Sequence, residues 1–160
     1  MNAFEVYAGF LAKVRKSTGI ESFAPDAGGL VSVRVDDAYN VNLQLVEATG
    51  KVLCFVELTE LPRDAPKSVY RDLLAGGFFG KDTAGGYFAL EAETETVVYN
   101  YLFDLERLAG DPVGFVSTLE KILQLCDVWA ERIKGAMAEG DGEKADVHGE
   151  MASGHTIFRA

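Results

Sequence analysis

YNVNLQLVEATGKVLCFVEL, residues 39–58, has the pattern of two strands joined by a tight turn. In its first half, Tyr39–Val46, every second residue is apolar, which is the period of a strand with one buried face. Ala48-Thr49-Gly50 predicts the turn, so the two strands form an antiparallel hairpin. The second half, Lys51–Leu58, is apolar on both faces, and both faces of this strand therefore need a cover.

Further strands flank this hairpin in the sequence. Leu30–Val35 alternates valines with Ser32 and Arg34, and Asp36-Asp37 predicts the turn that joins it to the hairpin. Tyr87–Glu91 and Thr96–Asp104 predict a fourth and a fifth strand, with Thr94-Glu95 near the turn between them. The fifth strand is again apolar on both faces.

Three segments have the spacing of amphipathic helices. The first covers residues 2–18, between a capping Asn2 and a terminating Gly19. The second starts at Asp64 or Ala65 and runs to the glycines near residue 76. The third covers residues 111–138, and Asp111-Pro112 marks its start.

These elements predict the order α-βββ-α-ββ-α, an α+β domain whose twisted antiparallel sheet is packed by helices. One domain covers residues 1–138, and residues 139–160 lose all periodicity, which predicts a flexible acidic and glycine-rich tail. Two strands with apolar residues on both faces leave apolar surface beyond what these helices cover. A homodimer contact, a bound partner segment, or both would cover that surface.

Composition restricts the partners. The formal net charge of −10 would repel a phosphate backbone, so nucleic acid is excluded as the main partner. No apolar run approaches the roughly 20 residues of a membrane-spanning helix, and the N-terminus has no secretion signal pattern. We therefore expect a cytoplasmic protein without membrane insertion. Cys54 and Cys126 lie in apolar patterns, which favours two buried free thiols over a disulfide.

The sequence LLAGGFFGKDTAGG, residues 73–86, invites comparison with a phosphate-binding loop. The Walker pattern GxxxxGK[ST] fails, because Asp82 follows Lys81 and Ala75 stands where a glycine is required. The segment also leads from a helix into a strand, so no helix N-terminus faces a phosphate. We expect a helix end followed by a loop, with Phe78 and Phe79 packing back toward the sheet.

No other pattern predicts catalysis, a metal site or a cofactor. His148 and His155, the two histidines, fall in the tail, which excludes a Ser-His or Cys-His nucleophile in the folded region. The carboxylates of Asp36-Asp37 and of residues 91–95 are better explained as polar turns. We therefore expect a binding protein and not an enzyme.

The element order resembles the type III secretion chaperones of the Tir-chaperone (CesT-like) family. The resemblance rests on VNLQLVEATGKVLCFVELTELP, on SVYRDLLAGGFFGKDTAGGYFALEAETETVVYNYLFDLERL and on DPVGFVSTLEKILQLCDVWAERI, and it spans roughly residues 4–135. It implies a cytoplasmic homodimer without catalytic activity or cofactor. Such a protein binds the N-terminal segment of a secreted effector in extended form and keeps it soluble and export-competent.

The resemblance also implies site residues. The second helix and the fourth and fifth strands correspond to the family's dimer contact, at Val69, Tyr70, Leu73, Leu74, Phe88 and Tyr99. The first helix and the first three strands correspond to its effector-binding grooves, at Phe10, Val31, Val33, Leu43, Leu45 and Phe55. A dimeric structural or regulatory module of the same fold, with no secretion client, is the alternative function.

Overall fold

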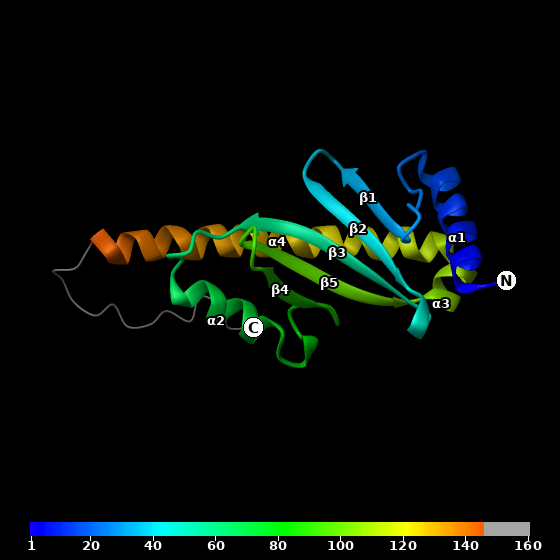
Figure 1. The fold of residues 1–160 in the computed structure, drawn as a ribbon. Coiled ribbons are helices and arrows are strands. Elements are labelled where there is room, and N and C mark those ends of the chain that lie inside the picture. The colour runs from blue at the N-terminus through cyan, green and yellow to red at the C-terminus, as the bar shows by residue number, and fades with distance from the viewer. Residues whose placement is uncertain (146–160) are drawn as a thin grey trace.

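The computed structural model describes the backbone of residues 1–145 and the side chains of residues 1–140. Figure 1 shows an α+β fold, as the sequence predicts. The elements in chain order are α1 (Ala3–Thr18), β1 (Leu30–Val35), β2 (Tyr39–Val46), β3 (Lys51–Glu60), α2 (Lys67–Gly76), β4 (Tyr87–Glu91), β5 (Thr96–Asp104), α3 (Leu105–Gly110) and α4 (Pro112–Ala145). Two short 3₁₀ turns, η1 (Glu47–Thr49) and η2 (Phe78–Gly80), lie between these elements.

The five strands form one antiparallel sheet in the order β1-β2-β3-β5-β4. The β2–β3 hairpin pairs Leu43 with Cys54, and its turn is η1 followed by Gly50 in the left-handed conformation. β3 then pairs with β5, which brings the two strands that are apolar on both faces side by side at the centre of the sheet.

The helices pack on one face of this sheet. α4 runs behind the strands in Figure 1, and α1 crosses its far end. Between these helices and the sheet lies the main core. Its largest fully buried members come from α1 and from β1, β2, β3 and β5: Tyr7, Phe10, Leu11, Val14, Val31, Val41, Leu43, Val52, Val56 and Tyr99. Phe10, Phe103 and Phe115 interlock there edge to face.

Local signals fix the ends of α1 and the start of α4. Asn2 and Glu5 form a capping box, and Gly19 ends α1 at φ +72°. The Asp111 carboxylate accepts a hydrogen bond of 2.8 Å from the backbone N–H of Gly114, and Pro112 is the first residue of α4. Both helix starts were predicted from these residues.

A second, smaller core joins α2 to α4. Val69 and Leu73 of α2 pack there with Leu61, Val97, Trp129 and Ile133. The Trp129 Nε1 donates a hydrogen bond of 2.8 Å to the carbonyl oxygen of Asp82, which ties the loop after α2 to α4. The Arg132 guanidinium lies 3.9 Å from the centre of a Trp129 ring and 3.1 Å from an Asp72 carboxylate oxygen.

Three predicted boundaries differ from the structure. α2 starts at Lys67 and not at Asp64 or Ala65, because Pro66 is its extended N-cap residue. α3 was not predicted. α4 continues to Ala145, so residues 139–145 are helical and not part of a tail. Residues 146–160, with His148 and His155, lie outside the described residues.

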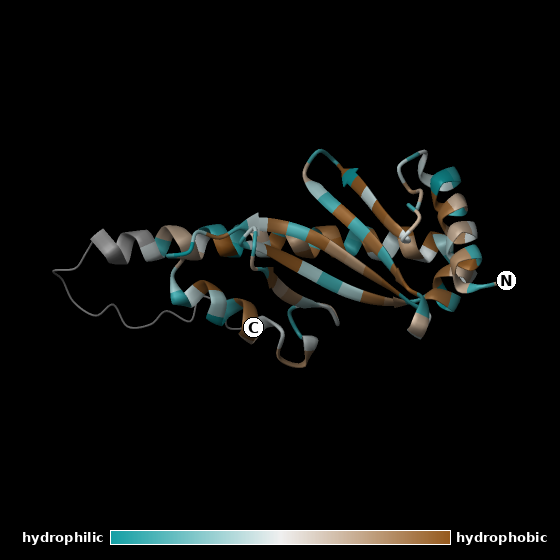
Figure 2. Cartoon of the chain, viewed as in Figure 1, coloured by the Kyte–Doolittle hydropathy of each residue, from teal (hydrophilic) through white to brown (hydrophobic). Residues whose placement is uncertain are grey.

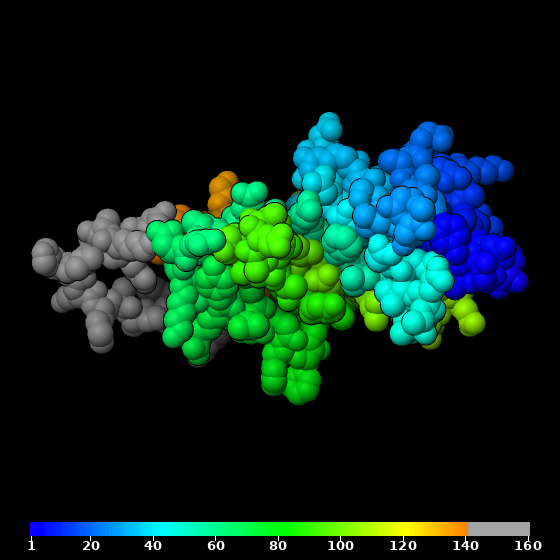
Figure 3. All heavy atoms as spheres, viewed as in Figure 1, coloured from blue at the N-terminus to red at the C-terminus, as the bar shows by residue number. Residues whose placement is uncertain are grey.

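The expectation that Phe78 and Phe79 pack back toward the sheet is wrong. Their side chains are 70% and 91% exposed, and they contact each other with ring centres 4.4 Å apart. The η2 turn is responsible, because Phe79 adopts φ +57° within it and both rings are directed away from the core. The segment that follows α2 protrudes from the body of the molecule (green, Figure 3).

Candidate partner-binding surfaces

An exposed apolar surface lies over α2 and its neighbours, and we call it the α2 surface. It consists of Tyr70, Leu74, Phe78, Phe79 and Leu90. Leu74 is 78% exposed and Leu90 is 41% exposed. Large apolar side chains at this exposure are unfavourable in water, so a contiguous group of them marks a contact surface.

Two shallow grooves give this surface its shape. The first, of about 150 Å³, lies between α2 and the β4–β5 hairpin, and the second runs along the outer side of α2 toward Phe78. Tyr70 and Leu74 line both grooves, so the grooves are continuous around these two side chains. The first groove is lined by Tyr70, Leu73, Leu74, Phe88, Ala89, Leu90 and Val97.

The six residues predicted for a dimer contact divide into two groups. Tyr70, Leu73, Leu74 and Phe88 come together as lining of the first groove. Val69 and Tyr99 lie beneath it and are at most 1% exposed. The Tyr99 hydroxyl donates a hydrogen bond of 2.8 Å to the carbonyl oxygen of Thr83, and its ring contacts Phe88, so Tyr99 supports the groove from inside.

Most residues predicted for the effector-binding grooves lie in the core of the chain. Their exposed fractions are 6% or less, because α1 and α4 cover the sheet face to which they point: Phe10, Val31, Val33, Leu43 and Leu45. Phe55 differs from them, because it is partly exposed and lies on the opposite face of β3. Of this set, only Phe55 offers its side chain to a partner on the surface of the chain.

The face of the sheet that the helices leave open is the second candidate surface, which we call the open face. Leu53 and Phe55 of β3 lie on it, and Leu53 pairs with the half-exposed Leu102 of β5. Phe55 lies between Asn42 and Asn100, each 7% exposed. Figure 2 shows brown and teal residues alternating along these strands. The open face is therefore a mixed surface of apolar side chains and amides.

Sequence reasoning missed Phe78, Phe79 and Leu90 as surface residues. Leu90 belongs to a short edge strand whose five residues are mostly exposed, which the alternating pattern did not indicate. Phe78 and Phe79 lie between glycines, outside any helical or strand stripe. Two adjacent phenylalanines flanked by residues that break helices were the signal of a contact surface.

The titratable groups with strongly shifted pKa values are structural. Burial raises the pKa of the Cys54 and Cys126 thiols to about 12, so neither is a thiolate near neutral pH. Burial and a hydrogen bond to Asp127 raise the pKa of Tyr39. Within residues 1–140 there is no group of three histidine, cysteine or carboxylate side chains arranged to hold a metal ion. In the described part of the chain, no helix has the length and apolar character to cross a membrane.

The fold is that of several solved chaperone structures. The structure described as the ExsC-ExsE complex matches with a TM-score of 0.72 and 18% identity, over 82% of this chain and 96% of that chain. The HopA1-SchA chaperone-effector complex matches with a TM-score of 0.62 and 20% identity, over 82% and 95%. The Yersinia pestis type III secretion chaperone SycH, in complex with a fragment of YscM2, matches with 0.54 and 17%, over 74% and 98%.

The family follows from the sequence match and not from the fold alone. No curated protein sequence is significantly similar to this chain. The model of the Tir chaperone protein (CesT) family matches residues 9–130, which is most of the chain and includes every strand. The agreement of this match with the fold leads to one conclusion: the chain is a type III secretion chaperone that belongs to the Tir chaperone protein (CesT) family.

Proposed function

We propose that this chain acts as a homodimer in the bacterial cytoplasm, where it binds the N-terminal segment of a secreted effector and keeps it soluble and export-competent. The observation that carries the proposal is the family match over residues 9–130. The solved neighbours support it, since one of them is described as a chaperone-effector complex. The exposed apolar surfaces of this chain supply the contacts that both interactions need.

The α2 surface is the proposed dimer contact. In a two-fold dimer the same patch meets itself, so it must carry both a projecting side chain and a recess for its mate. Leu74 projects from α2, and the groove between α2 and the β4–β5 hairpin adjoins it. Leu74 of one protomer can then enter this groove of its partner. Phe78 and Phe79 extend the apolar contact beyond α2.

The open face is the proposed client surface. An unfolded segment loses conformational entropy when it is ordered, and burial of its apolar side chains must offset that cost. Leu53, Phe55 and Leu102 offer apolar contacts on this face. The Asn42 and Asn100 amides lie among them as hydrogen-bonding groups. The net charge of −10 favours segments that are neutral or basic.

Sedimentation velocity tests the dimer. We expect the wild-type chain to sediment at twice its mass of 17.3 kDa. Leu74→Asp should give the monomer, because it would bury a carboxylate in an apolar contact. Val113→Asp is the matched control: Val113 is 73% exposed at the start of α4 and should tolerate the same change without dissociation. A wild-type monomer at micromolar concentration would contradict the proposed dimer.

Co-purification tests the client. The tagged chain is isolated from its own bacterium, and bound proteins are identified together with the region that resists proteolysis. We expect a secreted protein whose N-terminal region is retained, and we expect Phe55→Ser to weaken its retention. Val128→Ser, on the exposed side of α4, is the control. If the tagged chain retains partners but none is secreted, the structural or regulatory module replaces the secretion chaperone.

A further inference from the structure

The strand β5 has a complete neighbour on one side and an incomplete one on the other. β3 pairs with it from Thr96 to Asp104, whereas β4 pairs with it only from Thr96 to Asn100. Beyond Asn100 the β4 side of β5 is therefore a free sheet edge, which ends where the chain turns into α3.

The backbone groups of this free edge point outward at Leu102. The Leu105 N–H donates a hydrogen bond of 3.0 Å to the Gly50 carbonyl oxygen, on the β3 side. Alternate residues of an antiparallel strand bond to the same neighbour, so Phe103 also faces β3, and Leu102 turns its N–H and C=O to the open side. An edge with unpaired groups of this kind accepts another extended chain.

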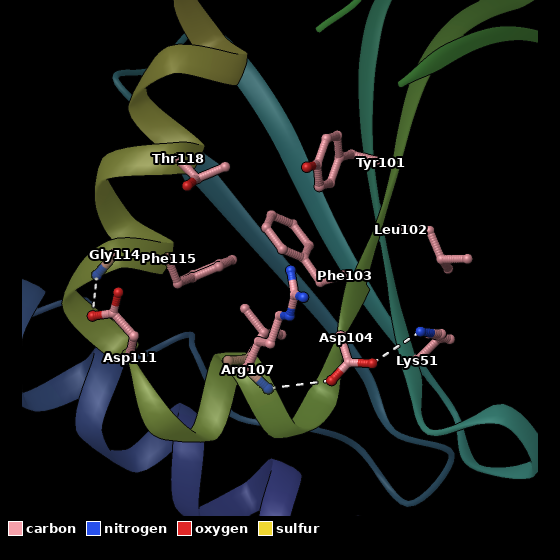
Figure 4. Close-up of a pocket in the computed structure, with 11 residues that line it drawn as sticks. Lys51, Tyr101, Leu102, Phe103, Asp104, Arg107, Asp111, Gly114, Phe115 and Thr118 are labelled. Carbon is pink, nitrogen blue, oxygen red and sulfur yellow. Dashed lines mark hydrogen bonds and ion pairs between the residues drawn. The ribbon is translucent and has the colours of Figure 1, made fainter. Parts of the chain in front are cut away.

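A cavity of about 770 Å³ lies along the same edge, between β5, α3 and the first turns of α4 (Figure 4). Its floor is apolar and already well packed, because Phe103, Leu108 and Phe115 are at most 9% exposed. Thr118 of α4 lies on the opposite wall from Lys51 (Figure 4). A large side chain that enters from the free edge would therefore rest on aromatic rings.

One cation of this cavity has no anionic partner among the described residues. Lys51 pairs with the Asp104 carboxylate at 2.9 Å, and the Asp111 carboxylate caps α4. Arg107 belongs to none of the ion pairs of residues 1–140, and its guanidinium points into the cavity toward Phe103 (Figure 4). On a chain of net charge −10, this guanidinium is a local attraction for a carboxylate.

We propose that the free edge of β5 binds one extended segment of a protein partner, which places a large apolar side chain on the Phe103–Phe115 floor and an acidic side chain against Arg107. The inference rests on the proposed function, in that it assigns one client segment to one site. Strand pairing requires a second extended backbone, which argues for a peptide as the occupant. Side chains on one face of a strand are two residues apart, so the segment reads apolar-x-acidic.

A defined peptide tests this site on the full-length chain. The probe is a fluorescein-labelled ten-residue peptide with a central Phe-Thr-Glu flanked by threonine and serine, and binding is measured by fluorescence anisotropy. Thr118→Phe fills the cavity and should weaken binding about tenfold or more. Ser117→Phe introduces the same side chain at the neighbouring exposed position of α4, outside the cavity lining, and should leave binding unchanged.

Charge reversal tests the role of Arg107 without filling the cavity. Arg107→Glu should weaken the Phe-Thr-Glu peptide and should favour a Phe-Thr-Lys peptide instead. Leu102→Pro removes the outward N–H and should abolish binding, whereas Leu102→Ala keeps the backbone donor and should reduce binding less. Thermal unfolding of each variant establishes that it is folded.

Several results would overturn the inference. Equal binding by the wild type and the Thr118→Phe variant would exclude the cavity, and an unchanged preference for glutamate in Arg107→Glu would exclude the charge contact. If Leu102→Pro dissociates the chain's own dimer, the free edge belongs to the contact between copies. The failure of this site is separable from that of the proposed function: an effector that co-purifies equally with wild type and Thr118→Phe leaves the chaperone function intact.

Discussion

Gly76, the last residue of α2, lies directly against the indole of Trp129 in α4. A Cβ atom at this position would overlap the Trp129 ring, so no larger residue fits without separating the two helices. The indole is itself held from two sides, by its hydrogen bond to the Asp82 carbonyl and by the Arg132 guanidinium above it. This contact fixes how α2, and with it the α2 surface, is placed on the rest of the fold.

The first prediction concerns this contact. Gly76→Ala should lower the free energy of unfolding by about 2 kcal/mol, because overpacking at a rigid ring costs more than helix propensity returns. Gly135→Ala in α4 is the matched control, because a Cβ atom added there would have no neighbour within 4 Å. It should raise the same quantity by about 1 kcal/mol. Urea unfolding of both variants measures the difference, and equal effects would refute the packing argument.

The second prediction concerns the strained Phe79. A left-handed backbone costs an L-residue about 1 kcal/mol, and glycine avoids that cost. In a Leu74→Asp monomer, Phe79→Gly should therefore stabilise the fold by about that amount. In the otherwise wild-type chain it should weaken dimerisation about tenfold or more, by loss of an exposed apolar contact.

Phe78→Gly is the control for the Phe79 variant, because Phe78 is not among the residues with positive φ. It removes the same side chain without relieving strain, so it should destabilise the monomer. Urea unfolding measures the stability of the monomers and sedimentation equilibrium measures the dimer. Equal destabilisation by both glycine variants would show that the left-handed backbone of Phe79 stores no strain.

The third prediction concerns the thiols. Cys54 and Cys126 are both buried and free, as the sequence predicted, and burial raises their pKa to about 12. At pH 8 a colorimetric disulfide reagent should therefore react with neither thiol in the native protein and with both after denaturation. An added exposed thiol, Ser117→Cys, should react at once. Rapid reaction of the native wild type would mean that the core opens locally around these residues.

The fourth prediction concerns pH. A hydrogen bond from Lys51, followed by one from the Arg107 backbone, lowers the pKa of Asp104 below its usual range. A carboxyl group with a depressed pKa stabilises the fold above its unfolded-state value, about 3.9, and this contribution is lost as the pH falls through the folded value. Lys51→Met should raise the pKa of Asp104, as measured by NMR titration of the carboxyl carbons.

Glu91 is the internal control for this titration. Its pKa is also lowered, but by hydrogen bonds from Thr94 and the Glu93 backbone at the other end of β5. Lys51→Met should leave the Glu91 value unchanged. A parallel shift of both carboxyl groups would point to a general change in the charge of the protein, and not to the loss of one hydrogen bond.

The regular elements of this fold could be predicted because each repeats one period over several residues. The five strands begin where the alternation predicts, and only β3 runs longer than predicted, to Glu60. α3 lacks such a signal. It has only six residues, it follows β5 without a break, and its start depends on the Asp104 side chain, which accepts a hydrogen bond from Arg107 N–H. A pattern cannot be read over so short a segment.

The candidate surfaces were harder to predict for a different reason. Alternation shows that Val31 and Leu43 share an apolar face, but not that the chain's own helices already cover it. The strands that are apolar on both faces were the better guide, because one of their faces must remain uncovered by those helices. Phe55 and Leu102 lie on that face. Exposure of Phe78 and Phe79 depends on one left-handed residue, which no period reveals.

The length of α4 has a consequence for how the molecule unfolds. Its 34 residues extend over about 50 Å. Phe115 and Ile122 near its start belong to the main core, and Trp129 and Ile133 further along belong to the smaller one. One continuous helix is thus a shared beam for both cores, and neither can melt without losing part of its support. Amide protons of β2 and of α2 should therefore exchange with solvent in a single cooperative opening of the whole domain.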